Sequence, residues 1–181
     1  MRHVLRRHPG SPCSAATHIE VEVARPHPGR LELSYVVAGR ISDVRMPSVT
    51  AATRSDELWR QTCFEAFVRA QAGDTYYEFN FAPSTQWAAY QFSSYRSGMA
   101  LPASISAPVI NVRSGSDCYT LQALLALDRL SALPRTASWR LGLSAVIEET
   151  NGRKSYWALA HPPGEPDFHH SFCFAHEFSP D

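Results

Sequence analysis

The stretch that decides the fold runs from residue 62 to residue 93 and reads TCFEAFVRAQAGDTYYEFNFAPSTQWAAYQFS. Gly73–Asp74 and Pro83–Ser84 divide it into three runs with alternating side chains. Successive residues of a β-strand point to opposite faces of the sheet, and glycine and proline favour the turns between strands. The stretch therefore predicts three strands, over 62–70, 75–81 and 86–93, joined into a meander.

The same alternation extends to both sides of this meander. Further strands are predicted over 19–23, 31–37, 104–113, 118–127, 139–147, 154–159 and 173–178. Asn151–Gly152 is the strongest turn signal, and it predicts a hairpin between two of these strands. Because no long segment has a helical period, the pattern predicts an all-β protein. About ten strands at this spacing favour a two-sheet antiparallel β-sandwich with a jelly-roll-like arrangement.

The chain has 181 residues, of which 44% are hydrophobic and 19% are charged, as is typical of a globular domain. We expect a single sandwich domain over residues 17–181. Residues 1–16 are basic and contain Pro9, Gly10 and Pro12, so we expect them to form a flexible N-terminal tail.

Charge and hydropathy narrow the range of partners. Seventeen basic residues balance seventeen acidic residues, and the net charge of zero gives no pull towards nucleic acid or an acidic membrane. No apolar run is long enough for a secretory signal or a membrane helix. We therefore expect a cytoplasmic protein in which the four separated cysteines are thiols.

Polar side chains share one face of the predicted meander. Glu65 lies opposite Phe64 and Ala66 in its strand, and Glu78 and Asn80 alternate with aromatic residues in the next strand. Tyr90 and nearby tryptophans offer flat apolar surface beside these carboxylate and amide groups. Sugars have apolar ring faces and hydroxyl edges, so this combination favours a saccharide or a sugar-containing metabolite as ligand.

Motifs for catalysis and nucleotide binding are absent from the sequence. It has no Gly-x-Ser-x-Gly elbow, no glycine-rich phosphate loop and no dinucleotide fingerprint. A non-catalytic module is therefore the leading interpretation. An enzyme that uses Glu65 and Glu78 as paired acids stays an alternative, if the two side chains lie in one pocket.

The last twenty-one residues contain His161, His169, His170 and His176. A metal site needs two or three such side chains to converge with a carboxylate. Adjacent residues of a strand point to opposite faces, so His169 and His170 do not easily share one ion. Packing or hydrogen bonding near the final strand is the favoured interpretation, and we expect no metal or other cofactor.

Four segments carry a resemblance to a known family: LWRQTCFEAFV (58–68), YYEFNFAPS (76–84), WAAY (87–90) and YRSGM (95–99). Together they resemble a bacterial DOMON-like domain, a group that is similar to family 9 carbohydrate-binding modules. The end of the chain also fits, because Phe168–His169 precedes the last predicted strand. The resemblance covers roughly residues 17–178.

This resemblance implies a β-sandwich whose relatives bind sugars or haem. In the sugar-binding relatives two tryptophans clamp a saccharide, helped by an acid and an arginine. By position, Trp59 corresponds to the first tryptophan and Glu65 to the acid, with Trp157 and Arg96 as candidates for the other two. The ligand-binding set that we predict is Trp59, Glu65, Arg96, Trp157, Glu78, Asn80 and Tyr90.

Two alternatives remain open beside the saccharide module. Haem-binding relatives use a methionine and a histidine as axial ligands, which implies Met99 with His161 or His169 as a haem or metal pair. The second alternative is a protein-interaction domain whose sheet face binds a protein partner.

Overall fold

The computed structural model describes residues 1–179 and contains eleven β-strands, which confirms the all-β prediction. The strands are β1 (Arg2–Arg7), β2 (Ala16–Ala24), β3 (Arg30–Gly39), β4 (Cys63–Ala70), β5 (Tyr76–Phe81), β6 (Trp87–Phe92), β7 (Val109–Ser114), β8 (Cys118–Ala126), β9 (Trp139–Glu148), β10 (Lys154–Ala158) and β11 (His176–Phe178). Three short 3₁₀ turns connect them: η1 (Ile41–Asp43), η2 (Leu58–Arg60) and η3 (Ser171–Cys173). No helix within residues 1–179 is long and apolar enough to cross a membrane. Residues 180–181, the end of the predicted domain, lie outside the described residues.

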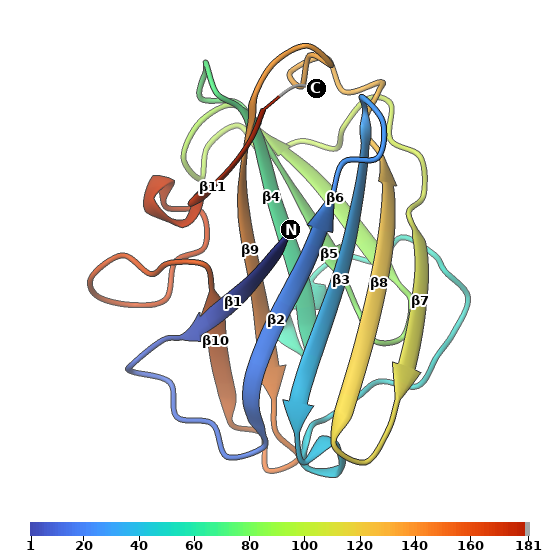
Figure 1. The fold of residues 1–181 in the computed structure, drawn as a ribbon, viewed down its shortest axis with the longest axis vertical. Coiled ribbons are helices and arrows are strands. Elements are labelled where there is room, and N and C mark those ends of the chain that lie inside the picture. The colour runs from blue at the N-terminus through green and yellow to red at the C-terminus, as the bar shows by residue number, and fades with distance from the viewer. Residues whose placement is uncertain (180–181) are drawn as a thin grey trace.

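The strands form one antiparallel path that folds into two layers (Figure 1). We call β2, β3, β8 and β7 sheet A, and β6, β5, β4, β9 and β10 sheet B. β1 joins the layers, because Leu5 pairs with Ile19 of β2 and Arg7 pairs with Trp157 of β10. β11 pairs with the first residues of β9. The predicted two-sheet sandwich is confirmed, including the β4–β5–β6 meander and the β9–β10 hairpin.

The prediction of a flexible tail over residues 1–16 is wrong for β1. Leu5 is the only residue of this strand that is buried, so the side-chain pattern gives no strand signal. The strand is instead stabilised by main-chain pairing on both of its edges. The Met1 ammonium group also donates a hydrogen bond of 2.7 Å to the carbonyl of Val23.

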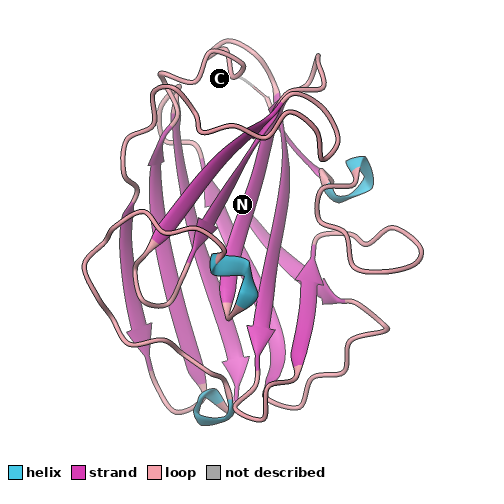
Figure 2. Ribbon diagram, turned by 180° about the vertical axis from the view of Figure 1, so that it is seen from behind, coloured by secondary structure: helices cyan, strands magenta, loops and turns pink. Residues whose placement is uncertain are grey.

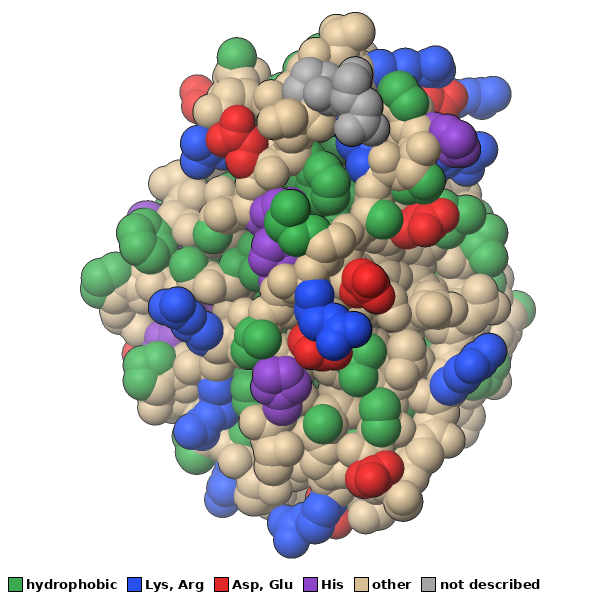
Figure 3. Space-filling model, in the orientation of Figure 1, with side chains coloured by type: hydrophobic (Ala, Val, Ile, Leu, Met, Phe, Trp, Pro, Cys, Tyr) green, Lys and Arg blue, Asp and Glu red, His purple; other side chains and the backbone are tan. Residues whose placement is uncertain are grey.

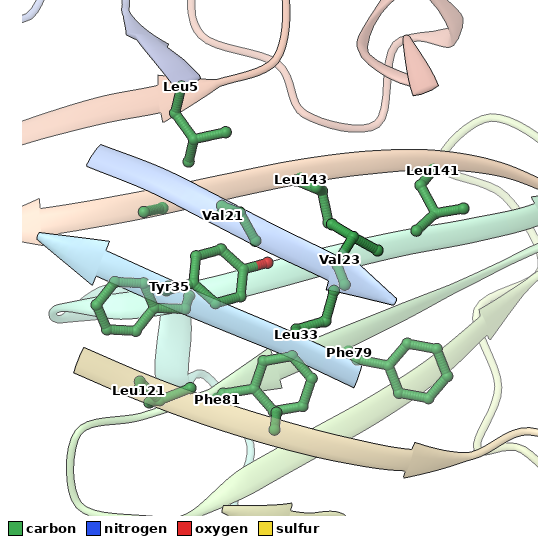
Figure 4. Close-up of a cluster of buried hydrophobic side chains, with 14 of the residues drawn as sticks. Leu5, Val21, Val23, Leu33, Tyr35, Phe79, Phe81, Leu121, Leu141 and Leu143 are labelled. Atoms are coloured by element: carbon green, nitrogen blue, oxygen red, sulfur yellow. The ribbon is translucent and has the colours of Figure 1, made fainter. Parts of the chain in front are cut away.

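The main core lies between the two sheets (Figure 4). Val21, Val23, Leu33 and Tyr35 contribute from sheet A, and Phe79, Phe81, Leu141 and Leu143 contribute from sheet B. The Tyr35 hydroxyl crosses the core and donates a hydrogen bond of 2.6 Å to the carbonyl of Glu65. A buried polar group with a partner avoids the cost of desolvation without a hydrogen bond, so Tyr35 fixes the two layers against each other.

The outer face of sheet B is covered as well, which differs from an ordinary half-exposed antiparallel sheet. Its aromatic side chains form a second buried cluster with Leu58 and with residues of the C-terminal segment, which we define as residues 159–175. The members from sheet B include Phe67, Tyr76, Tyr90 and Phe92. Figure 2 shows η2 in front of these strands. The polar groups on this face therefore lie beneath protein.

The outer face of sheet A is turned to the viewer in Figure 3. Acidic and basic side chains are interspersed on it, with apolar side chains scattered between them. Arg2 and Glu20, for example, form an ion pair of 3.5 Å across β1 and β2. Both signs of charge therefore mix on this face.

Candidate functional site

The predicted polar face of the meander is present on the outer side of sheet B. Strand register places Glu65 of β4 between Asn80 of β5 and Ser144 of β9. The Ser144 hydroxyl donates to Glu65 Oε2 at 3.2 Å, and the Asn80 amide nitrogen donates to Glu78 Oε1 at 2.8 Å. Glu65 is only 3% exposed and Glu78 only 6% exposed. We call Glu65 and Glu78 the buried carboxyl pair.

Burial decides the charge of this pair. Loss of water raises the pKa of Glu65 well above its usual value, and the negative charge of Glu78 raises it further. Burial also raises the pKa of Glu78, against the hydrogen bond from Asn80 and the positive charge of Arg96, which lower it. Two neighbouring buried carboxylates repel each other, so we expect the pair to hold a proton at neutral pH.

His169 connects this pair to the surface. A hydrogen bond of 2.8 Å joins its Nδ1 to the Tyr76 hydroxyl, and its Nε2 lies 3.6 Å from Glu78 Oε2. Burial lowers the pKa of His169 to about 4, and the positive charge of Arg96 acts in the same direction. At neutral pH the imidazole is therefore neutral, and its contact with Glu78 is not an ion pair.

An open pocket of about 300 Å³ lies above Tyr76 and His169. We call it the Tyr95 pocket, and it is lined by Arg69, Asp74, Tyr76, Tyr95, His169, His170, Ser171 and Phe174. Its residues come from the end of β4, the β4–β5 turn, the start of β5, the loop after β6 and the C-terminal segment. The pocket thus combines three aromatic rings with charged and neutral hydrogen-bonding groups.

Arg96 holds two walls of this pocket together without lining it. Its guanidinium donates to Asp167 Oδ1 at 2.7 Å, and the Tyr95 hydroxyl donates to Asp167 Oδ2 at 2.6 Å. The main-chain nitrogen of Arg96 donates to the Tyr76 hydroxyl at 3.2 Å. These bonds attach the loop after β6 both to β5 and to the C-terminal segment. Arg96 is therefore placed to fix Tyr95.

The structure does not form the predicted clamp between Trp59 and Trp157. Trp59 lies on η2 and is 48% exposed. Trp157 pairs with Ala145, which faces the interior, so its ring lies in the main core and is only 5% exposed. Its indole nitrogen donates to Ser155 Oγ at 2.9 Å. The two rings lie on opposite faces of sheet B.

Tyr90 shares the outer face of sheet B but not the pocket. Its hydroxyl donates to Asp56 Oδ1 at 2.6 Å, and Arg54 donates to the same oxygen at 2.7 Å. Burial and the Asp56 carboxylate raise the pKa of Tyr90. Tyr90 thereby anchors residues 54–56, which precede η2, to the strand beneath them.

The residues considered for haem do not fit it in this structure. Met99 is exposed on the loop after β6. His161 donates a hydrogen bond of 2.8 Å from Nε2 to the carbonyl of Arg6, and both nitrogens of His169 face protein groups. No ring nitrogen of His169 therefore points to an open site for iron. Within residues 1–179, no three His, Cys, Asp or Glu side chains converge as a metal site.

Sequence reasoning missed most of the pocket. Arg69 and Tyr76 occupy the polar side of their strands, in the same alternation as Glu65 and Glu78, so register could have found them. Tyr95 lies in the quoted YRSGM segment beside Arg96. Phe174 lies in a stretch predicted as strand, but the structure ends η3 at Cys173 and begins β11 at His176. The Asp167 contacts that assemble these walls give no local sequence signal.

No protein-family model matches the chain, and no curated protein matches it. Among solved structures, a candidate carbohydrate-binding protein from Bacteroides uniformis is similar, with a TM-score of 0.69 and 13% identity over 95% of this chain and 83% of that chain.

A family 9 carbohydrate-binding module from Caldicellulosiruptor kristjanssonii is similar in two solved complexes. The complex with cellotriose has a TM-score of 0.51 and 11% identity, over 91% of this chain and 74% of that chain. The complex with glucose has a TM-score of 0.50 and 11% identity, over 88% of this chain and 76% of that chain. The DOMON relationship stays a prediction. The fold of this chain is similar to that of family 9 carbohydrate-binding modules, as the sequence predicts.

Proposed function

We propose that this chain is a saccharide-binding module and that the Tyr95 pocket is its site. The observation that carries the proposal is the set of side chains that line the pocket. The fold that holds them is similar to that of modules solved with cellotriose and with glucose. Tyr76, Tyr95 and Phe174 offer apolar ring surface, and Arg69, Asp74 and His170 offer directed hydrogen bonds. A sugar requires both kinds of group around one ring.

The size of the pocket supports a short ligand. Its volume of about 300 Å³ lies at the lower end of the roughly 300–1,000 Å³ that small-molecule sites span. We therefore propose a mono- or disaccharide, or a sugar-containing metabolite, rather than a long polysaccharide. The buried carboxyl pair does not line the pocket, and His169, which does, contacts Glu78 at 3.6 Å. We also propose a cytoplasmic location. The four cysteines are free thiols, as a reducing compartment would keep them.

Titration calorimetry with glucose, galactose, cellobiose and their acidic derivatives tests this function. We expect heat with at least one of them, and a loss of that heat in Tyr95→Ala, because the ring surface is removed. Tyr95→Phe keeps the ring and is expected to bind within about fivefold of wild type, because only the hydroxyl contact to Asp167 is lost.

Trp59→Ala locates the site, since Trp59 lies outside the pocket lining. Binding that survives Trp59→Ala and disappears in Tyr95→Ala supports the Tyr95 pocket. Binding lost only with Trp59 would move the site to η2. Absence of heat with every sugar at millimolar concentration would refute the function. Circular dichroism confirms that each variant is folded.

A further inference from the structure

Arg69 lines the Tyr95 pocket and forms no ion pair within residues 1–179. It ends the polar side of β4, paired with Tyr76 on one edge and with Arg140 on the other. Its guanidinium carbon lies 5.2 Å from the centre of the Phe174 ring. Its Nε is buried and has no hydrogen-bond partner in the described residues. Within residues 1–179 the Nη1 and Nη2 groups of Arg69 also make no hydrogen bond and, unlike Nε, are not buried, so they are the donors left for a ligand.

Two neighbouring charged residues, Asp167 and Arg140, are already paired, in contrast to Arg69. Asp167 accepts hydrogen bonds from Arg96, Tyr95 and the main chain of His169. Arg140 forms an ion pair with Glu177 at 3.4 Å. Within residues 1–179 no carboxylate forms an ion pair with Arg69. The exposed Asp74 is the acidic residue that shares the pocket lining with it.

His170 adds a second donor with a defined orientation. The main-chain nitrogen of Phe172 donates to His170 Nδ1 at 3.2 Å. Because Nδ1 accepts this bond, the neutral ring carries its proton on Nε2. His170 lines the pocket together with Arg69, so an imidazole N–H and a guanidinium serve one space.

We propose that the saccharide taken by the Tyr95 pocket carries one anionic group, which the Arg69 guanidinium binds. This inference rests on the proposed function and specifies its ligand class. A carboxylate or phosphate presents two oxygens to the planar fork of arginine, a geometry that favours anions over neutral hydroxyls. The sugar ring then lies against Tyr95, and the His170 Nε2–H donates to a further ligand oxygen.

Matched sugars test the anionic group. Calorimetry compares glucose with glucuronic acid, galactose with galacturonic acid, and both with glucose 6-phosphate, which separates a carboxylate from a phosphate source. Inorganic phosphate alone is the probe without a sugar ring. We expect the acidic sugar to bind roughly 10- to 100-fold more tightly than its neutral partner, as hydrogen bonds to a charged group allow. The preference should shrink between 50 and 500 mM NaCl.

Variants at Arg69 assign the preference to this side chain. Arg69→Gln is expected to abolish the preference for the acidic sugar over its neutral partner, because the positive charge that binds the anionic group is lost. The affinity for the neutral sugar is measured in the same variant, so that the ratio of the two affinities reports the charge alone. Asp74→Asn is expected to strengthen binding of the acidic sugar by removing a repelling charge. Arg113→Gln, on β7 of sheet A, is the matched control and should leave both affinities unchanged.

The outcomes separate this inference from the proposed function. Equal binding of neutral and acidic sugars would overturn the anionic ligand and leave the saccharide module standing. A preference that persists in Arg69→Gln would overturn the role of Arg69. If inorganic phosphate binds as tightly as any sugar, the sugar ring contributes nothing, and the proposal that the anionic ligand is a saccharide would be overturned. No binding of any sugar would refute the proposed function itself.

Discussion

Glu65 makes folding stability sensitive to pH in a direction unusual for a carboxyl group. Its pKa in the folded protein is raised well above the ordinary value of 4.5, chiefly by burial. The folded state therefore holds this proton more tightly than the unfolded state does. The stabilisation is complete below pH 4.5 and is lost as the pH rises through the raised folded value.

Glu65→Gln tests this coupling, because glutamine resembles the protonated acid and cannot ionise. We expect its free energy of unfolding, relative to wild type, to increase by more than about 1 kcal/mol between pH 5 and pH 9, since one pKa unit corresponds to about 1.4 kcal/mol. Chemical denaturation at several pH values measures it. The exposed Glu32→Gln serves as control. A difference that does not change with pH would contradict the buried-proton account.

Glu149 behaves in the opposite way. Its Oε1 accepts hydrogen bonds from the main-chain nitrogens of Ser14 and Ala15, at 2.6 and 2.8 Å, and from the Ser14 hydroxyl at 2.8 Å. Burial alone would raise the pKa of Glu149, but these bonds outweigh it and lower the pKa to about 2. The stabilisation is therefore present above pH 4.5 and is lost as the pH falls towards 2.

Glu149→Gln is expected to destabilise the protein by about 1.5–3 kcal/mol at pH 7, the range for hydrogen bonds to a charged group. The difference from wild type should narrow as the pH falls from 4.5 towards 2. Urea unfolding at pH 7 and pH 3 measures both values, with the exposed Glu22→Gln as the matched change on β2. An equal loss at both pH values would show that shape, rather than charge, holds residues 14–15.

At the scale of the element, β1 closes the gap between the two sheets and is stabilised mainly through its main chain. Leu5 is 2% exposed in the core, whereas the adjacent Val4 is 54% exposed on the outer side. Leu5→Ala is expected to lower the free energy of unfolding by about 2–5 kcal/mol. Val4→Ala should change it by less than about 0.5 kcal/mol. Thermal unfolding of the pair decides whether β1 is part of the cooperative unit, because equal small effects would mean that it frays independently.

The elements also show what side-chain pattern can and cannot predict. Strands that alternate strongly, such as β3 and β9, follow from the sequence because one of their faces must be buried. β1 escapes prediction because pairing, not alternation, stabilises it. β7 begins at Val109, later than the predicted residue 104, because the preceding residues belong to the loop after β6.

The alternating side-chain pattern likewise predicts that Glu65, Glu78 and Asn80 share one side of β4 and β5. It does not predict whether that side is exposed to solvent or covered by protein. The clue was present in the sequence, since Phe67 and Tyr76 share this face with the polar groups. Large aromatic side chains on the expected solvent side indicate a second covering layer. Which distant segment supplies that layer depends on tertiary contacts such as those of Phe174, and local pattern cannot give them.

At the scale of the whole molecule, the Tyr95 pocket lies where the C-terminal segment meets sheet B. Its walls come from β4, β5, the loop after β6 and residues 169–174. A ligand that contacts all of these walls holds the C-terminal segment onto the sheet, and it stabilises the folded state by mass action. Binding and global stability are therefore expected to rise together, even though sheet A takes no part in the site.

Glucuronic acid at about 100 times its dissociation constant should add about 2.7 kcal/mol of stability, which corresponds to a rise in Tm of roughly 5–10 °C for a domain of this size. Hydrogen exchange should slow most in the loop after β6 and in the C-terminal segment, because these parts depend on contacts across the pocket. Arg69→Gln at the same glucuronic acid concentration should gain only about 0.4–1.4 kcal/mol, because a 10- to 100-fold weaker affinity leaves the ligand at about 1 to 10 times its dissociation constant. Its hydrogen exchange should slow correspondingly less. Protection centred on β7 and β8 would instead place the ligand on sheet A, and that result would contradict both the location of the site and the argument that it fastens the second layer to the sandwich.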